Sequence, residues 1–154
     1  MEKKYKLTEE TINVDGRTLY RIEALKDFDV VEKGDKGGFI ENERNLSQSG
    51  DCWVYENAKV YGNAEVYDDA KVYGNAWVFD NAKVFEDAEV FGIAEVCGNT
   101  EISGDAEIRG NAEIASNSDY IVFKNWWSSG RHFTWTKSNN MWKVGCFYGT
   151  GEEL

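Results

Sequence analysis

An aliphatic residue recurs every six residues through the middle of the chain, and in most repeats a small residue follows it four positions later. A six-residue period does not fit the 3.6-residue turn of an α-helix, but it fits a short strand followed by a sharp turn. Because side chains alternate across a strand, each small residue faces the same side as the aliphatic residue two positions later. The pattern therefore predicts stacked short strands around an interior of Val, Ile and Ala. The aliphatic positions are Val54, Val60, Val66, Val72, Val78, Val84, Val90, Val96, Ile102, Ile108 and Ile114.

Turn-forming pairs such as Gly62-Asn63 and Asp80-Asn81 separate the predicted strands. Gly, Asn and Asp accept the left-handed backbone angles that a sharp corner needs. With these turns, the repeat resembles that of the hexapeptide-repeat, left-handed parallel β-helix family. The resemblance implies an all-β fold in which three hexads form one triangular coil of 18 residues, giving about four coils. The left-handed sense is implied by the resemblance alone, because parallel crossovers are generally right-handed.

Both ends of such a coil stack need a cap that covers exposed strand edges and apolar interior. Asp15-Gly16 is a strong hairpin turn signal between strand-like segments 12–14 and 18–22, so we expect a β-hairpin at the N-terminal end. Residues 119–154 carry nine aromatic residues and alternate like strands, which predicts an aromatic-rich C-terminal β cap. We expect one domain, with the hairpin cap in 1–36, the β-helix in 37–118 and the Trp-rich cap in 119–154.

The predicted β-helix ends near residue 118. Ser118 fits the small position of one more hexad, and Tyr120 takes the place of its aliphatic residue. Over the whole chain, the GGFIEN segment at 37–42 and the Trp-rich tail resemble those of uncharacterised bacterial and bacteriophage hexapeptide-repeat proteins. That resemblance implies no catalytic residues.

The residue after each core aliphatic faces outward, and the first seven such residues are aromatic. Stacked rings could cover one another and be covered by the terminal segments, or one face could pack against neighbouring chains. We expect a homotrimer, because large exposed aromatic patches commonly mark interfaces. The two tryptophans that interrupt the charged outward positions are the best candidate anchors. The candidate interface residues are Trp53, Tyr55, Tyr73, Trp77 and Phe79.

The composition argues against two classes of binding partner. The net charge is −11, and residues 51–118 alone hold 14 acidic and 4 basic residues. This argues against nucleic acid and against an anionic membrane, since both attract cationic surfaces. No apolar run reaches the roughly 18 residues that cross a bilayer. The three widely spaced cysteines and the absence of a signal-like apolar segment favour the reducing cytoplasm, without a disulfide framework or a metal site.

One histidine limits the possible chemistry. His132 is the only histidine, so the three-histidine zinc site of proteins resembling gamma-class carbonic anhydrases is excluded. Hexapeptide acyltransferases, an activity that the family resemblance implies for this fold, use one histidine as general base while acyl-CoA lies between neighbouring prisms. His132 could take this part, although acidic outer faces disfavour the phosphates of CoA. A serine nucleophile would need an orienting carboxylate, and the acidic residues of 119–154 are only Asp119, Glu152 and Glu153.

The most distinctive polar cluster lies in the C-terminal cap. A Ser/Gly turn with a cation among tryptophans could hold a planar or phosphorylated ligand, or it could be a tight turn above a small aromatic core. The first hypothesis is a non-catalytic binding or scaffold protein, trimeric, holding a small ligand or a host protein. In a phage-type version, a small nucleotide-like ligand is sequestered at this cap or in clefts between subunits. Acyl transfer is the alternative. The candidate ligand-binding residues are Trp126, Trp127, Ser128, Arg131, His132 and Trp135.

Overall fold

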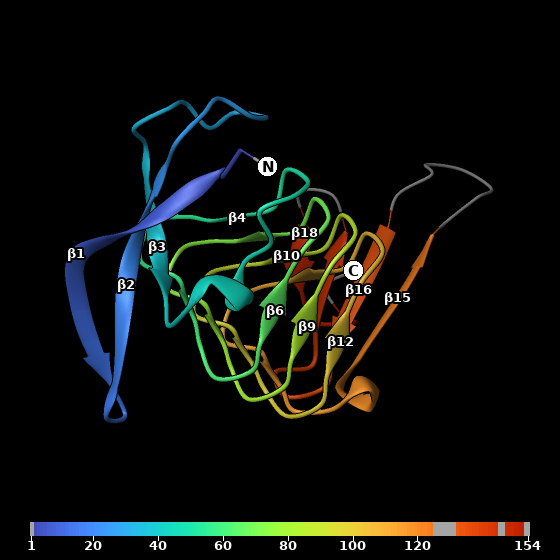
Figure 1. Cartoon of the computed structure of the whole chain (residues 1–154). Coiled ribbons are helices and arrows are strands. Elements are labelled where there is room, and N and C mark those ends of the chain that lie inside the picture. Colours follow the sequence, from blue (N-terminus) through green and yellow to red (C-terminus); the bar gives the residue numbers. More distant parts are fainter. Residues whose placement is uncertain (1, 125–131, 145–146, 153–154) are drawn as a thin grey trace.

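The structure is a computed structural model that describes residues 2–124, 132–144 and 147–152 (Figure 1). Its described elements are strands and two single-turn 3-10 helices, η1 (Glu43–Asn45) and η2 (Asn117–Asp119). In the repeat region each strand holds only two residues and ends on the aliphatic residue of its hexad. These strands are β4 (Trp53–Val54), β5 (Lys59–Val60), β6 (Glu65–Val66), β7 (Lys71–Val72), β8 (Trp77–Val78), β9 (Lys83–Val84), β10 (Glu89–Val90), β11 (Glu95–Val96), β12 (Glu101–Ile102), β13 (Glu107–Ile108) and β14 (Glu113–Ile114).

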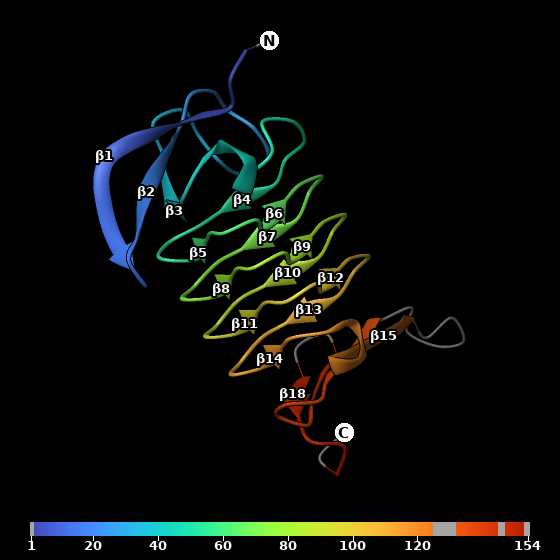
Figure 2. The same cartoon turned by 60° about the horizontal axis from the view of Figure 1, so that its bottom comes forward.

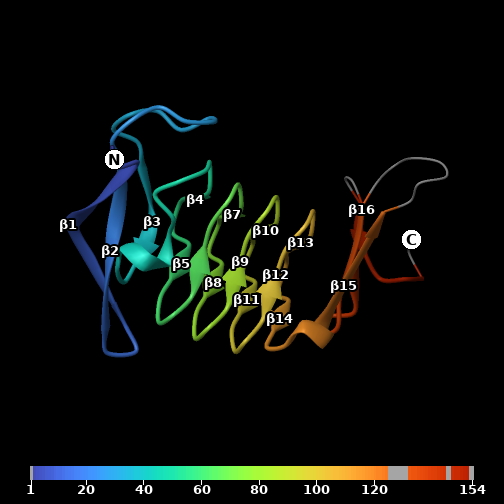
Figure 3. The same cartoon turned by 45° about the vertical axis from the view of Figure 1, so that its right-hand side comes forward.

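Each repeat strand pairs in parallel with the strand 18 residues later, so every third strand shares a face. The three faces are β4-β7-β10-β13, β5-β8-β11-β14 and β6-β9-β12. About four coils therefore stack into a β-solenoid, which Figures 2 and 3 show along their length. The predicted all-β coil stack is confirmed.

The interior is the one that the repeat predicts. Aliphatic residues such as Val72 and small residues such as Ala70 are completely buried in every coil. Val54 stands directly over Val72 in the paired register, so like residues contact like residues from coil to coil. The corners adopt left-handed backbone angles, with φ of 67° at Gly62 and 59° at Asp80.

The N-terminal hairpin continues one face of the solenoid. Strands β1 (Tyr5–Val14) and β2 (Arg17–Ala24) pair antiparallel around Asp15-Gly16. Strand β3 (Lys36–Ile40) pairs antiparallel with β2 and parallel with β5, so it joins the hairpin to the coils.

Two side chains at the start of β1 close the first coil. The phenol of Tyr5 donates a 2.6 Å hydrogen bond to the carbonyl oxygen of Leu46. The buried ammonium of Lys4 donates to the carbonyl oxygen of Cys52 at 2.7 Å, and burial lowers the pKa of this lysine. These bonds satisfy backbone oxygens that have no earlier coil to pair with.

The opposite end carries an antiparallel sheet (Figure 3). It consists of β15 (Tyr120–Lys124), β16 (His132–Thr136), β17 (Met141–Val144) and β18 (Phe147–Gly149). The prediction for Ser118 is wrong. This residue is exposed within η2, because the chain turns there to leave the coil instead of adding another hexad.

Candidate functional site

The histidine of the C-terminal sheet contacts an aspartate of the last coil. His132 begins β16, and its Nε2 lies 2.8 Å from Oδ2 of Asp105, in the corner before β13. Two residues further along both segments, the hydroxyl of Thr134 accepts a 3.1 Å hydrogen bond from the backbone N–H of Glu107. This second contact fixes β16 against β13 and so aligns the imidazole with the carboxylate.

Asp105 was not among the residues predicted from the sequence, because only the acidic residues within 119–154 were expected to lie near His132. The carboxylate comes from the repeat region, since β16 lies across the end of the solenoid and reaches it there. The 18-residue register offered a partial signal, because Asp51, Asp69, Asp87 and Asp105 occupy the same corner in successive coils. No sequence pattern indicated which strand of the tail would lie against that corner.

A carboxylate that accepts a hydrogen bond from Nε2 leaves Nδ1 of the neutral imidazole as the unprotonated nitrogen. His132 and Asp105 are both partly exposed, with side-chain exposures of 32% and 50%. A solute can therefore reach the pair from solvent. The arrangement can accept a proton at Nδ1 and stabilise the resulting imidazolium through Asp105.

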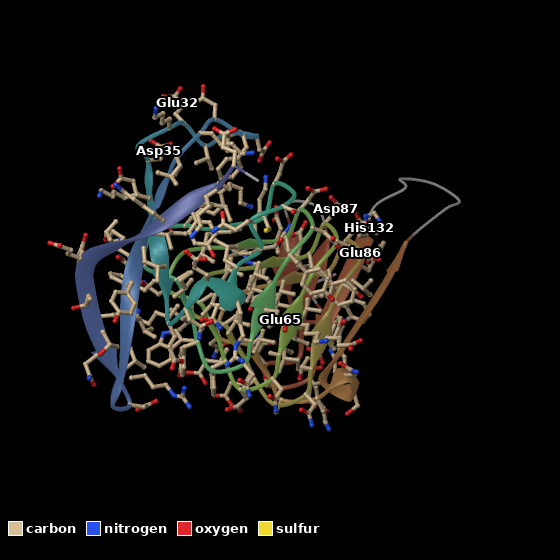
Figure 4. The ribbon with its side chains drawn as sticks, in the orientation of Figure 1. Glu32, Asp35, Glu65, Glu86, Asp87 and His132 are labelled. Atoms are coloured by element: carbon tan, nitrogen blue, oxygen red, sulfur yellow. The ribbon has the colours of Figure 1, made fainter. Side chains whose placement is uncertain are left out.

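The surface around this pair is acidic. Asp87 occupies the corner position one coil earlier, and Figure 4 shows Asp87 and Glu86 beside His132. Glu86 accepts a hydrogen bond from the backbone N–H of Gly104. One cation of the sheet, Lys143, pairs with Glu107 at 2.8 Å and is only 12% exposed. A second cation, Lys124 of β15, lies opposite His132 in the strand register. On the solenoid side of the pair, the described charged side chains are therefore carboxylates, which attract cations.

The structure describes only two of the six predicted ligand-binding residues. Trp126, Trp127, Ser128 and Arg131 lie outside the described residues. The two that are described do not come together, because neighbouring side chains alternate across a strand. His132 faces the solenoid, whereas Trp135 lies on the other face of β16, opposite Trp142, and donates a 3.0 Å hydrogen bond to Asn140.

The candidate interface residues have different surroundings in the single chain. Trp53 is 1% exposed and packs against Tyr5 and Phe28, with ring centroids 6.1 and 5.2 Å away. Terminal segments therefore already cover it. Trp77 remains partly exposed and makes an edge contact with Tyr61.

The predicted ladders of outward rings are confirmed. Phe79 lies 5.2 Å from Tyr61 between ring centroids, and their planes are 5° apart. Tyr73 stacks on Phe91 at 4.6 Å and receives the edge of Tyr55 at 6.3 Å. These contacts within the chain hold the rings in place and leave the trimer untested.

Two kinds of feature are absent from the part of the chain that the structure describes. There, no three His, Cys, Asp or Glu side chains are grouped so that they could hold a metal ion. Nor is any helix of that part long and apolar enough to cross a membrane.

No protein-family model matches the chain. A segment of it is similar to a protein described as an uncharacterized acetyltransferase, YdcK, from Escherichia coli (strain K12). The two are 39% identical over 62 residues, which cover 35% of this chain and 19% of that protein. The chain thus matches only about a fifth of the length of this relative. Together with the stacked coils, the similarity fits a hexapeptide-repeat β-helix.

Proposed function

We propose that this protein is an acyltransferase that uses acyl-CoA as donor and His132 as general base. The observation that carries the proposal is the 2.8 Å contact between His132 Nε2 and Asp105 Oδ2. The similarity to a protein described as an acetyltransferase supports the reaction class, although it covers only part of both chains.

In the proposed reaction, the acceptor nucleophile attacks the thioester carbonyl of the donor. Nδ1 of His132 takes the proton of the nucleophile, and Asp105 stabilises the imidazolium through Nε2. The thiolate of CoA then leaves as the tetrahedral intermediate collapses, and the acyl group remains on the acceptor. Asp105 is a positioning residue, because it acts through the imidazole and does not contact the reacting atoms.

The carboxylates on the solenoid side of His132 favour an amine acceptor. Asp87 and Glu86 attract an amine in its protonated form, and this amine must lose one proton to solvent before it attacks. The same carboxylates repel the phosphates of the donor from this corner. The donor is therefore expected to approach from the side away from these carboxylates.

The test incubates the full chain with acetyl-CoA and a panel of amines and alcohols, and measures release of the CoA thiol. His132→Ala should lower turnover about 10²- to 10⁴-fold, the usual contribution of a general base. Asp105→Asn should lower it less and shift the pH–rate profile. Asp51→Asn, at the same corner in the first coil, is the matched control. Unchanged turnover in His132→Ala would reject His132 as the base.

A non-catalytic binding protein is the second candidate, as a homotrimer that holds a small nucleotide-like ligand. The acidic corner repels the phosphates of a nucleotide as it repels those of CoA, so such a ligand would have to bind away from that corner. The test is a thermal-shift screen with nucleotides and cyclic dinucleotides, in which Arg131→Ala should abolish the stabilisation. If acetyl-CoA assays give no turnover and no nucleotide raises the melting temperature, both candidates fail.

A further inference from the structure

One arginine in the last coil has aromatic neighbours but, within the part of the chain that the structure describes, no acceptor for its hydrogen bonds. Arg109 stands where the earlier coils place Tyr55, Tyr73 and Phe91, so it continues the column of outward rings. Its guanidinium carbon lies 5.2 Å from the ring centre of Phe91 and 4.5 Å from that of Tyr148. The planar cation therefore contacts both the last ring of its column and a ring of the C-terminal sheet.

The described arginines differ in how their guanidinium groups are satisfied. Arg17 binds both oxygens of Glu41, Arg21 binds Glu10 and two carbonyl oxygens, and Arg44 binds Asn63. Among the described residues Arg109 has neither a carboxylate partner nor a hydrogen-bond acceptor. Its Nε is completely buried without a partner, whereas its terminal nitrogens are not buried.

The carboxylates on the same face are engaged elsewhere. Glu89 accepts a 3.1 Å hydrogen bond from the phenol of Tyr73, and Glu107 pairs with Lys143 at 2.8 Å. The ring of Tyr148 is itself held, because its phenol oxygen accepts from Asn139 at 3.0 Å. The guanidinium is thus fixed in place before any ligand arrives, which reduces the entropy lost on binding.

We propose that Arg109 is an anion-binding site for a carboxylate or phosphate group. Two rings lie against the guanidinium and its Nε is buried without a partner, so the two terminal nitrogens are the atoms that remain for a ligand. The two terminal nitrogens can donate two parallel N–H···O bonds to two oxygens of one carboxylate or phosphate group. Arginine binds oxyanions in this bidentate way. The site does not depend on acyl transfer.

The experiment titrates the ¹⁵N-labelled full chain with sodium phosphate and, separately, with sodium acetate, with NaCl keeping the ionic strength constant. The backbone amides of Gly110 and Tyr148 should shift saturably with at least one of these anions. Comparing the phosphate and acetate titrations identifies whether the site prefers a phosphate or a carboxylate. Coenzyme A is left out so that the result is independent of the proposed reaction.

Arg109→Phe extends the ring column and so should keep the fold while abolishing the saturable shifts. Arg109→Lys keeps the positive charge but lacks the planar pair of terminal nitrogens that can bind two oxygens at once. This variant should therefore bind the anion at least several-fold more weakly. Arg17→Gln is the control, because this arginine is already paired, and its response should match that of the unaltered protein. Shifts that do not saturate, or that persist in Arg109→Phe, would overturn the proposal.

Discussion

The hydroxyl of Thr134 lies in the place where another coil would present a carbonyl oxygen. In the preceding coil the backbone N–H of Glu89 donates to the carbonyl oxygen of Ala106 at 2.9 Å, whereas the equivalent N–H of Glu107 donates to Thr134 Oγ1 at 3.1 Å. The other two faces end in the same way, with Glu101 bound to Asn117 and Glu113 bound to Ser138. Side chains therefore finish the backbone ladders of the solenoid.

Replacing Thr134 by Val should leave the N–H of Glu107 without its acceptor while keeping the shape of the side chain. The expected loss is about 1–3 kcal/mol in the free energy of unfolding, measured by urea denaturation. The exposed β2 residue Thr18 is the control, and Thr18→Val should change stability by less than about 0.5 kcal/mol. Equal losses in the two variants would contradict the capping role.

Gly50 should tolerate alanine much less well than Gly16. Both have left-handed backbone angles, with φ of 72° and 81°. A Cβ on Gly50 would collide with the carbonyl oxygen of Asp68, whereas a Cβ on Gly16 meets nothing within 4 Å. Gly16→Ala should cost about 1–2 kcal/mol from strain alone. Thermal and urea unfolding should show a clearly larger loss for Gly50→Ala, and similar losses would argue against the close approach of these coils.

The two candidate anchor tryptophans should behave differently when truncated. Trp53→Ala should cost about 3–5 kcal/mol in unfolding free energy, because its ring is buried within the chain. Trp77→Ala should cost less in the monomer. If the protein is a homotrimer that uses this face, Trp77→Ala should reduce the mass measured by light scattering. A single-chain mass for the unaltered protein at all concentrations would reject the trimer.

Stability should fall at alkaline pH because several phenols are buried. Burial raises the pKa of Tyr61 from its ordinary value of 10.0 to about 12, and it also raises the pKa values of Tyr5 and Tyr73. The unfolded chain releases these protons near pH 10, whereas the folded chain retains them. Unfolding free energy should therefore be intact below about pH 10 and decline as pH rises toward 12. A flat profile in urea denaturation across this range would contradict the burial of these phenols.

The solenoid could be predicted in detail because its interactions repeat. Val54 and Val72 occupy the same place in two hexads, and the 18-residue register that pairs them follows from the period. The hairpin turn at Asp15-Gly16 was equally readable, since two adjacent residues carry the signal. In both cases the information is local or periodic, so no distant contact had to be inferred.

The contacts at the two proposed sites are neither local nor periodic. The sequence by itself determined the coil, its buried Val and Ala residues and the ladders of outward rings. Only the tertiary structure decided that β16 lies against β13, which brings His132 to Asp105, and that β18 places Tyr148 over Arg109. The physical reason is that these pairs depend on how a non-repeating sheet docks on the last coil. That docking is set by many side-chain contacts acting together, including the hydrogen bonds of Thr134 and Ser138 to the final strands.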